Sequence, residues 1–236
     1  MSSQNWYRGN THTHTNVSDG NASLEYTAEW YHKHGYDWLV ITDHNKFTPV
    51  EEIPYHPETP FLLIAGCEIS MSAEGKPVHV CAVNPRENPN SVAMPTIIQT
   101  LQAGVDRTNT LGGIPIINHP NWCWAFTEYH MARVTDWALF EIFNPSTDCN
   151  NWGGGGELSM EERWDRMLSA GMRVFAVAAD DSHTFVGEFY GHLSLPGLGW
   201  VTVRAPELTT DAICAALKAG DFYASTEIEL EDYEVT

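Results

Sequence analysis

The sequence predicts an α/β fold built on a parallel sheet or a (β/α) barrel, because short apolar segments alternate with amphipathic ones. Several of the apolar segments are continuous runs, as expected of parallel strands that are buried on both faces. The expected strands cover residues 6–12, 38–42, 61–65, 78–83, 114–118, 138–143, 174–179 and 200–203. The expected helices, each followed by glycine, cover residues 23–34, 95–111, 159–170 and 210–219.

The length of 236 residues favours one domain over residues 1–236, with a core at about 6–225 and a C-terminal tail at 226–236. No internal repeat or interdomain linker is visible in the sequence. The four glycines at 153–156 predict a loop that connects two elements.

Charge and cysteine usage narrow the possible partners. The chain has 31 acidic against 12 basic residues, a net charge of -19, which disfavours a nucleic acid polymer or an anionic membrane as partner. The apolar stretch at 61–67 is far too short to span a bilayer, and the N-terminus lacks the pattern of a signal peptide. Five cysteines without a C-x-x-C motif favour reduced thiols and a cytoplasmic location. We therefore expect a small-molecule substrate, and the sequence leaves the oligomeric state open.

Two His-x-His motifs occur among the 11 histidines, although chance alone would give roughly half a pair. His12 and His14 end an expected strand, where residues two apart face the same side with Cα atoms about 7 Å apart, so both rings could reach one ion. His32 and His34 fall in an expected helix, where residues two apart point in different directions, and are assigned to the surface.

Further metal-binding residue types follow other expected strands. In a barrel the carboxyl ends of the strands meet on one face, where sites are built. Mixtures of imidazole and carboxylate suit Zn, Mn or Fe. The candidates at strand ends are His44, Glu68, His119, Asp181 and His183. His79 should lie inside the sheet, because its neighbours on both sides are apolar, and Asp19 lies five residues beyond His14 in a loop that can fold back.

These residues resemble the motifs of the polymerase and histidinol phosphatase (PHP) family of metal-dependent phosphoesterases. The run from His12 to Gly20 is similar to its H-x-H-T-x-x-S-D-G motif, and Thr42-Asp43-His44 is similar to its T-D-H motif. The later E, H, H and D-x-H positions correspond to Glu68, His79, His119 and Asp181-Ser182-His183. The segment around 207–226 resembles the carbaryl-hydrolase-like branch of the family.

The resemblance implies a distorted (β/α)7 TIM-like barrel, the PHP fold, with two or three divalent ions (Mn, Zn or Fe). By position, the first ion would be held by His12, His14, Glu68 and Asp181. The second would be held by Glu68, His79 and His119, and the third by Asp19, His44 and His183. Asp43 and Asp180 are not ligands in that scheme; they would either orient a neighbouring imidazole or cap the end of a strand.

The resemblance implies an enzyme that hydrolyses a small phosphorylated metabolite, a phosphoric monoester or diester, with a metal-bridging hydroxide as nucleophile. The catalytic residues would be His12, His14, Glu68, Asp181 and His183. Lys46 could contact a phosphate, and Trp122 and Trp124 could wall an apolar pocket. A carboxylic or carbamate ester hydrolase on the same metals is the closest alternative, and a non-catalytic metal-binding barrel is a further one.

Overall fold

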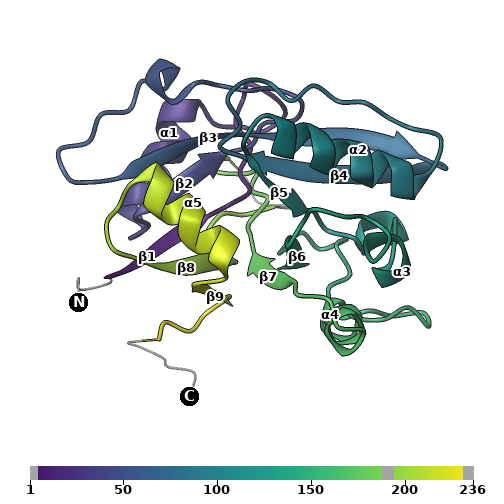
Figure 1. Ribbon diagram of the computed structural model, residues 1–236. Helices are drawn as coiled ribbons and strands as arrows, with labels where there is room; N and C mark the ends of the chain where they lie inside the picture. The colour runs from purple at the N-terminus through teal and green to yellow at the C-terminus, as the bar shows by residue number, and fades with distance from the viewer. Residues whose placement is uncertain (1–4, 188–193, 231–236) are drawn as a thin grey trace.

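The computed structural model describes residues 5–187 and 194–230 (Figure 1). Within them one mixed sheet has the strand order β7-β6-β5-β4-β3-β2-β1-β8-β9. The strands are β1 (Asn5–Asn10), β2 (Trp38–Ile41), β3 (Leu62–Ala73), β4 (Lys76–Val83), β5 (Ile114–Ile117), β6 (Leu139–Phe143), β7 (Phe175–Ala178), β8 (Trp200–Ala205) and β9 (Phe222–Ser225). All eight expected strands are confirmed, and β9 is an addition that the sequence analysis missed.

The sheet is only partly parallel. The pairs β1–β2, β2–β3, β5–β6 and β6–β7 are parallel, as expected. In contrast, β4 is antiparallel to both of its neighbours, and β8 is antiparallel to β1 and β9. The physical reason at β4 is the turn at Glu74 and Gly75, with φ of 54° and 73°, since a two-residue turn can join only antiparallel strands.

Strand β3 is much longer than the expected segment at 61–65. Its second half, Gly66 to Ala73, pairs along its whole length with β4. Polar residues interrupt this half, among them Glu68 and Ser70, so it lacks the continuous apolar run that marks the first half. The extension carries Glu68 into the middle of the strand rather than leaving it at the end.

The sheet curls until its first and seventh strands meet beyond their carboxyl ends. There Thr13 and Ser182 form a parallel bridge, with His14 N donating to Ser182 O at 2.9 Å and Asp181 N donating to His12 O at 3.0 Å. At the opposite end the rings of Phe175 in β7 and Phe222 in β9 lie 6.3 Å apart. The sheet is therefore a nearly closed barrel, although the regular alternation of seven strand–helix units is not confirmed.

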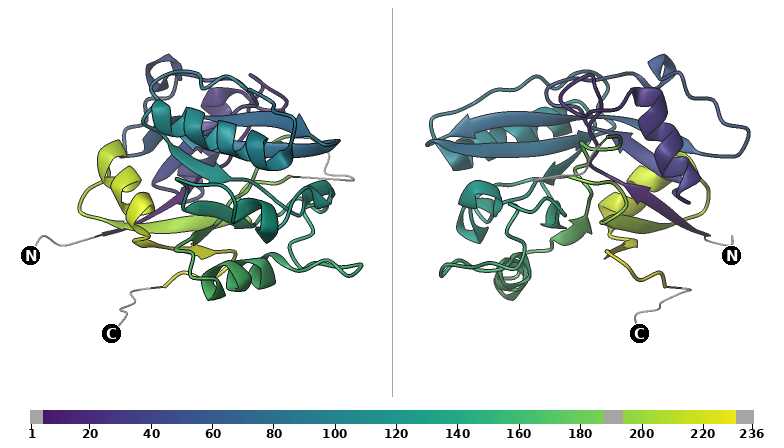
Figure 2. Two further views of the ribbon diagram at one scale, coloured as in Figure 1. Left: turned by 45° about the vertical axis from the view of Figure 1, so that its right-hand side comes forward. Right: turned by 180° about the vertical axis from the view of Figure 1, so that it is seen from behind.

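Helices cover the outside of this barrel (Figure 2). They are α1 (Leu24–Lys33), α2 (Ile97–Thr110), α3 (Glu128–Met131), α4 (Met160–Ser169) and α5 (Thr210–Ala219), with short 3-10 turns η1 (Val50–Glu52) and η2 (Trp122–Trp124). The four expected helices are confirmed, and α3 and the 3-10 turns were not expected. Hydroxyl side chains cap the four longer helices, as Ser23 does by accepting a hydrogen bond from Tyr26 N.

Close packing fixes α2 against the sheet. Leu101 and Val105 of α2 share a buried cluster with Ile69 and Val80. A Cβ atom at Gly104 would lie 2.9 Å from the Met71 side chain and 3.1 Å from Val80, so the glycine permits the close approach of the helix. The packing holds β3 and β4 together, and these strands carry two of the candidate ligands.

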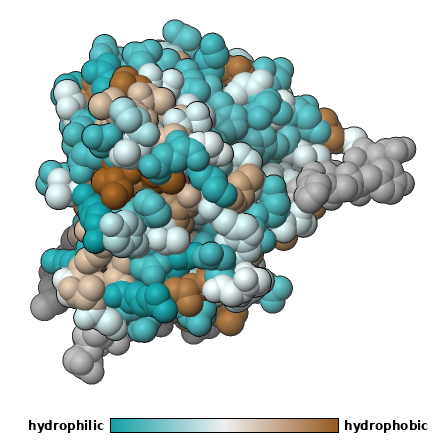
Figure 3. All heavy atoms as spheres, turned by 90° about the vertical axis from the view of Figure 1, so that its right-hand side faces the viewer, coloured by the Kyte–Doolittle hydropathy of each residue, from teal (hydrophilic) through white to brown (hydrophobic). Residues whose placement is uncertain are grey.

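The surface and the thiols agree with the composition. Hydrophilic residues cover most of the face that carries α3 and α4, with apolar residues in small groups (Figure 3). All five cysteines are free. In the part of the chain that the structure describes, no helix combines the length and apolar character that crossing a bilayer requires.

Candidate metal centre

Glu68 occupies the centre of the candidate site. Its side chain is completely buried, and nitrogen atoms of five histidines lie 2.5–3.5 Å from its two carboxylate oxygens. These histidines are His12, His14, His44, His79 and His119. The oxygen Oε2 has no well-aligned hydrogen bond in the described residues, although His44 Nδ1 lies 2.5 Å away. A bound cation would satisfy it.

His12 and His14 meet in the way that the strand-end position predicted. Both are completely buried, and their Nε2 atoms lie 3.1 Å apart. Both nitrogens also approach Asp181 Oδ1, at 3.1 Å from His12 and 2.9 Å from His14. Asp181 Oδ1 makes no well-aligned hydrogen bond with either ring, and a buried oxygen placed between two imidazole nitrogens fits a metal ligand.

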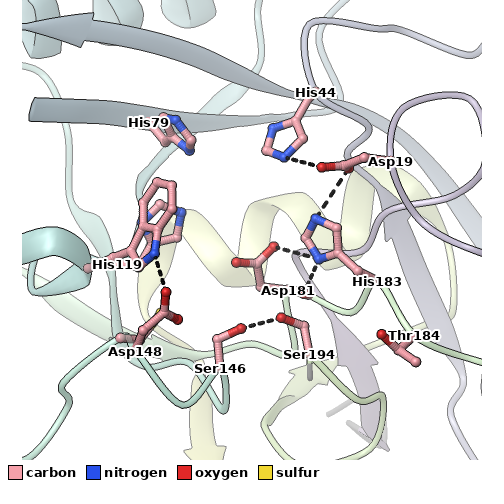
Figure 4. Close-up of a pocket in the computed structure, with 12 residues that line it drawn as sticks. Asp19, His44, His79, His119, Ser146, Asp148, Asp181, His183, Thr184 and Ser194 are labelled. Carbon is pink, nitrogen blue, oxygen red and sulfur yellow. Dashed lines mark hydrogen bonds and ion pairs between the residues drawn. The ribbon is translucent and has the colours of Figure 1, made fainter. Parts of the chain in front are cut away.

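Asp19 connects the remaining histidines at the outer side of the cluster (Figure 4). His183 Nε2 lies 3.3 Å from Asp19 Oδ1, and His44 Nε2 lies 3.5 Å from Asp19 Oδ2. The loop after His14 folds back to bring Asp19 there, as the spacing predicted.

The donor atoms form three overlapping groups that could each hold an ion. The groups are His12, His14 and Glu68; His44, Glu68 and His79; and His14, Asp19, His44 and His183. They differ from the scheme that the resemblance implied in three respects: Asp181 is not grouped with His12, His14 and Glu68; His14 also joins Asp19; and His44 takes the place of His119 beside His79. The structure brings all nine side chains together, and the division of ligands between ions stays a prediction.

Opposite charges stabilise one another inside this cluster. Burial would raise the pKa of the Glu68 carboxyl, but His79 and His12 hold it well below its usual range. Burial would likewise lower the pKa of His12, but the carboxylates led by Asp181 hold it well above its usual value. Burial would also lower the pKa of His183, but the carboxylates, chiefly that of Asp19, raise it to about 9. The carboxylates thus favour positive charge at several of the imidazoles, although the pKa of buried His14 is lowered to about 4, and this environment fits a mixed imidazole and carboxylate site for Zn, Mn or Fe.

Glu141 supports the site and was missed in the sequence analysis. It lies in β6 and is 1% exposed, and its Oε1 atom lies 2.5 Å from His12 Nδ1. The same carboxylate accepts hydrogen bonds from Asn118 Nδ2 at 2.8 Å and His119 N at 2.9 Å. It holds His12 with Nε2 turned toward Glu68, as carboxylates do behind metal-bound histidines. A carboxylate inside the apolar run 138–143 was the available signal.

Two candidate ligands have strained backbones. His119 and Asp181 have φ values of 25° and 48°, in a region that non-glycine residues rarely adopt. Such conformations cost on the order of 1–3 kcal/mol each and persist where surrounding structure imposes them.

Asp43 and Asp180 cap strand ends and orient no ligand directly. Asp43 accepts hydrogen bonds from Thr15 N at 2.7 Å and Ser18 Oγ at 2.7 Å, which fixes the loop after His14. Asp180 accepts hydrogen bonds from backbone nitrogens of 197–199, each at 2.8 Å. These contacts agree with strand-end capping, which is one of the two roles predicted for Asp43 and Asp180.

A cavity of about 300 Å³ opens onto the cluster. Its lining comprises Asp19, His44, His79, His119, Trp122, Ser146, Asp148, Cys149, Asp181, His183, Thr184 and Ser194. Trp122 lines it as expected and packs against His79 and His119, with ring centroids 5.4 and 5.2 Å apart. Lys46 and Trp124 are not among the lining residues, so the geometry does not support their predicted contacts with substrate.

No protein-family model and no curated protein matches the sequence. Among solved structures, a two-domain protein from Bacteroides vulgatus that contains a predicted PHP-like metal-dependent phosphoesterase matches 94% of the chain at 18% identity, with a TM-score of 0.65. A predicted metal-dependent phosphoesterase from Bifidobacterium adolescentis matches 80% of the chain and 92% of its own at 14% identity, with a TM-score of 0.52. A lesion-specific endonuclease from Pyrococcus furiosus matches 93% of the chain at 12% identity, with a TM-score of 0.56.

The chain spans 65% of the Bacteroides protein and 58% of the Pyrococcus protein. At these identities the likeness concerns the fold alone. The chain therefore has the same fold as these three proteins.

Proposed function

We propose that the protein is a metal-dependent hydrolase of the PHP family and that it cleaves the phosphate ester of a small metabolite. The observation that carries the proposal is the burial of Glu68 among five histidines, whose ring nitrogens lie 2.5–3.5 Å from its two carboxylate oxygens. Burying so many ionisable groups together is costly for a purely structural core, whereas bound metal ions would compensate the cost. The fold shared with predicted metal-dependent phosphoesterases supports the same assignment.

The ligands follow the scheme of the family, with the first ion on His12, His14, Glu68 and Asp181. Glu68, His79 and His119 would hold a second, and Asp19, His44 and His183 a third. When bound, these Mn, Zn or Fe ions supply positive charge for the phosphate oxygens and acidify a water molecule.

The chain's own side chains prepare the site in several ways. Glu141 keeps the Nδ1 atom of His12 occupied, so that Nε2 is directed at the other ligands. Asn144 Nδ2 donates to Asp181 Oδ2 at 3.0 Å, which leaves Oδ1 directed at the two histidines. Trp122 covers His79 and His119 and keeps water from that side of the cluster.

Hydrolysis of a generic aryl phosphate, measured beside the matching aryl ester after loading with Mn or Zn, tests the proposal. We expect release of the phenol from the phosphate and little release from the ester. Cleavage of the ester alone would replace the proposal by its closest alternative, a carboxylic or carbamate ester hydrolase. That alternative is favoured by the resemblance to the carbaryl-hydrolase-like branch and by the aromatic wall at Trp122.

A non-catalytic metal-binding barrel is the remaining alternative. Metal analysis of protein purified without added metal distinguishes it, because the proposed enzyme should retain at least one ion per chain. Less than one ion, together with no activity after reconstitution, would contradict the proposed function.

A further inference from the structure

The cavity over the candidate metal centre contains no lysine or arginine. All twelve basic residues of the chain lie in the described segments 5–187 and 194–230, and none of them belongs to the cavity lining. Lys46, which was predicted to contact a phosphate, is exposed and does not line the cavity. Beyond the metal ligands, the described lining therefore offers no lysine or arginine to pair with a second anionic group on a substrate.

Beside Trp122 and Cys149, the wall away from the metal ligands carries three hydroxyl groups and one carboxylate (Figure 4). Ser146 and Ser194 hydrogen-bond to each other through their hydroxyl oxygens, and Thr184 lies on the same side of the cavity. Hydroxyl groups can both donate and accept, so they match other hydroxyl groups well.

Asp148 is the carboxylate of this wall. Its Oδ2 atom accepts a hydrogen bond from Trp122 Nε1 at 2.8 Å, which fixes its orientation. Its Oδ1 atom has no hydrogen-bond partner among the described residues and can accept a hydrogen bond from a ligand. A carboxylate accepts hydrogen bonds from hydroxyl groups and repels phosphate or carboxylate groups.

Resting on the proposed function, we infer that the substrate is a phosphate monoester whose alcohol part is uncharged and carries free hydroxyl groups, with no second phosphate or carboxylate. Asp148 is then a specificity-determining residue that accepts a hydroxyl hydrogen and excludes anions. The cavity volume of about 300 Å³ agrees with a small polyol or sugar. Asp148 is exposed, so solvent screens its interaction with charges of either sign, and the absence of lysine and arginine from the lining adds to the discrimination against anions.

Three compounds that differ at one position test the inference on the metal-loaded protein. Glycerol 3-phosphate ends in a neutral hydroxymethyl group. In 3-phosphoglycerate a carboxylate replaces this group, and in 3-amino-2-hydroxypropyl phosphate, the amine, an aminomethyl group with a positive charge replaces it. We expect kcat/KM to be about tenfold or more higher for glycerol 3-phosphate than for 3-phosphoglycerate, and higher than for the amine. Equilibrium binding of the phosphonate analogues of the first two compounds should show the same order without turnover.

The variant Asp148→Asn identifies the residue responsible. The amide still accepts the Trp122 hydrogen bond but loses the charge, so discrimination against 3-phosphoglycerate should fall several-fold. Asp165→Asn, which removes one charge from the exposed side of α4, is the matched control and should keep the preference.

An aryl phosphate separates the possible failures. If it is cleaved but 3-phosphoglycerate or the amine equals glycerol 3-phosphate, the inference on substrate class is wrong while the proposed function stands. If Asp148→Asn leaves the preference unchanged, the assignment of Asp148 is wrong. If no phosphate ester is cleaved, the proposed function and the inference fall together.

Discussion

The two His-x-His motifs have the same spacing and opposite surroundings. His12 and His14 are completely buried and lie within 3.5 Å of the carboxylates of Asp181 and Glu68. His34, in contrast, is exposed and stacks on Trp30 with ring centroids 3.7 Å apart. The spacing of the two motifs is thus the same, and the partners that other strands supply make the difference.

The second motif has neutral partners throughout. His32 Nδ1 lies 2.7 Å from Tyr55 Oη, and its Nε2 accepts or donates a hydrogen bond with Thr59 Oγ1 at 2.9 Å. In the described part of the chain, neither His32 nor His34 forms an ion pair with a carboxylate. A helix places its histidines over neighbouring turns, whereas the end of a barrel strand directs them at the ends of the other strands.

Replacing both histidines of each motif gives the largest contrast. His12→Ala with His14→Ala removes ligands from two candidate ion groups, so turnover of an aryl phosphate should fall by more than about a hundredfold. His32→Ala with His34→Ala should keep turnover within about twofold, as expected of a surface change. Metal content by mass spectrometry and circular dichroism should show a lost ion in the first variant and a folded chain in both. Retained turnover in the first variant would refute the assignment.

The effect of metal removal on Tm should also differ between variants of the two motifs. If ions bind only the folded chain, free metal at about 100 times Kd adds about 2.7 kcal/mol to the free energy of unfolding. For a chain of this size, that shifts Tm by roughly 5–10 °C. Chelation should therefore lower Tm in the wild type and in the variant with His32 and His34 replaced. The variant without His12 and His14 should lose part of this shift, and an unchanged shift there would place the ions elsewhere.

The residues that hydrogen-bond to His12 and to His32 allow a finer comparison of the two motifs. Glu141→Gln keeps a hydrogen-bonding oxygen beside His12 but removes the charge, which should weaken metal affinity about tenfold. Tyr55→Phe removes the hydroxyl that contacts His32 and should leave metal affinity unchanged. Titration with a competing metal indicator measures both. Equal affinities in the two variants would show that Glu141 has only a packing role.

The strand ends were predictable because residue types alone carry that signal. The residues around Asp43, His119 and Asp181 all follow continuous apolar segments, which are the strongest local mark of a buried strand. Glu68 was identified by residue type, but its position in mid-strand was not foreseen, because β3 continues as a hairpin with alternating polarity.

Other features depend on contacts that no local pattern reports. Glu141 interrupts an apolar run, but only its distance to His12 shows that it serves the site. The cavity wall at Ser146, Asp148 and Ser194 comes from loops far apart in the sequence. Antiparallel pairing of β8 with β1 is likewise set by tertiary packing, since the apolar run at 200–203 would suit either direction.

The smallest effect concerns His34 alone, whose ring lies on Trp30 at an interplanar angle of 12°. His34→Ala removes this stacking and the contact of Nδ1 with Trp30 O, so the free energy of unfolding in urea should fall by about 0.5–1 kcal/mol. His34→Phe keeps an aromatic ring and should recover most of that loss. Metal content should be unchanged in both variants, because the histidine stabilises only α1. Loss of metal in a His34 variant would contradict this distinction between the two motifs, because it would show that His32 and His34 influence metal binding without contacting the cluster.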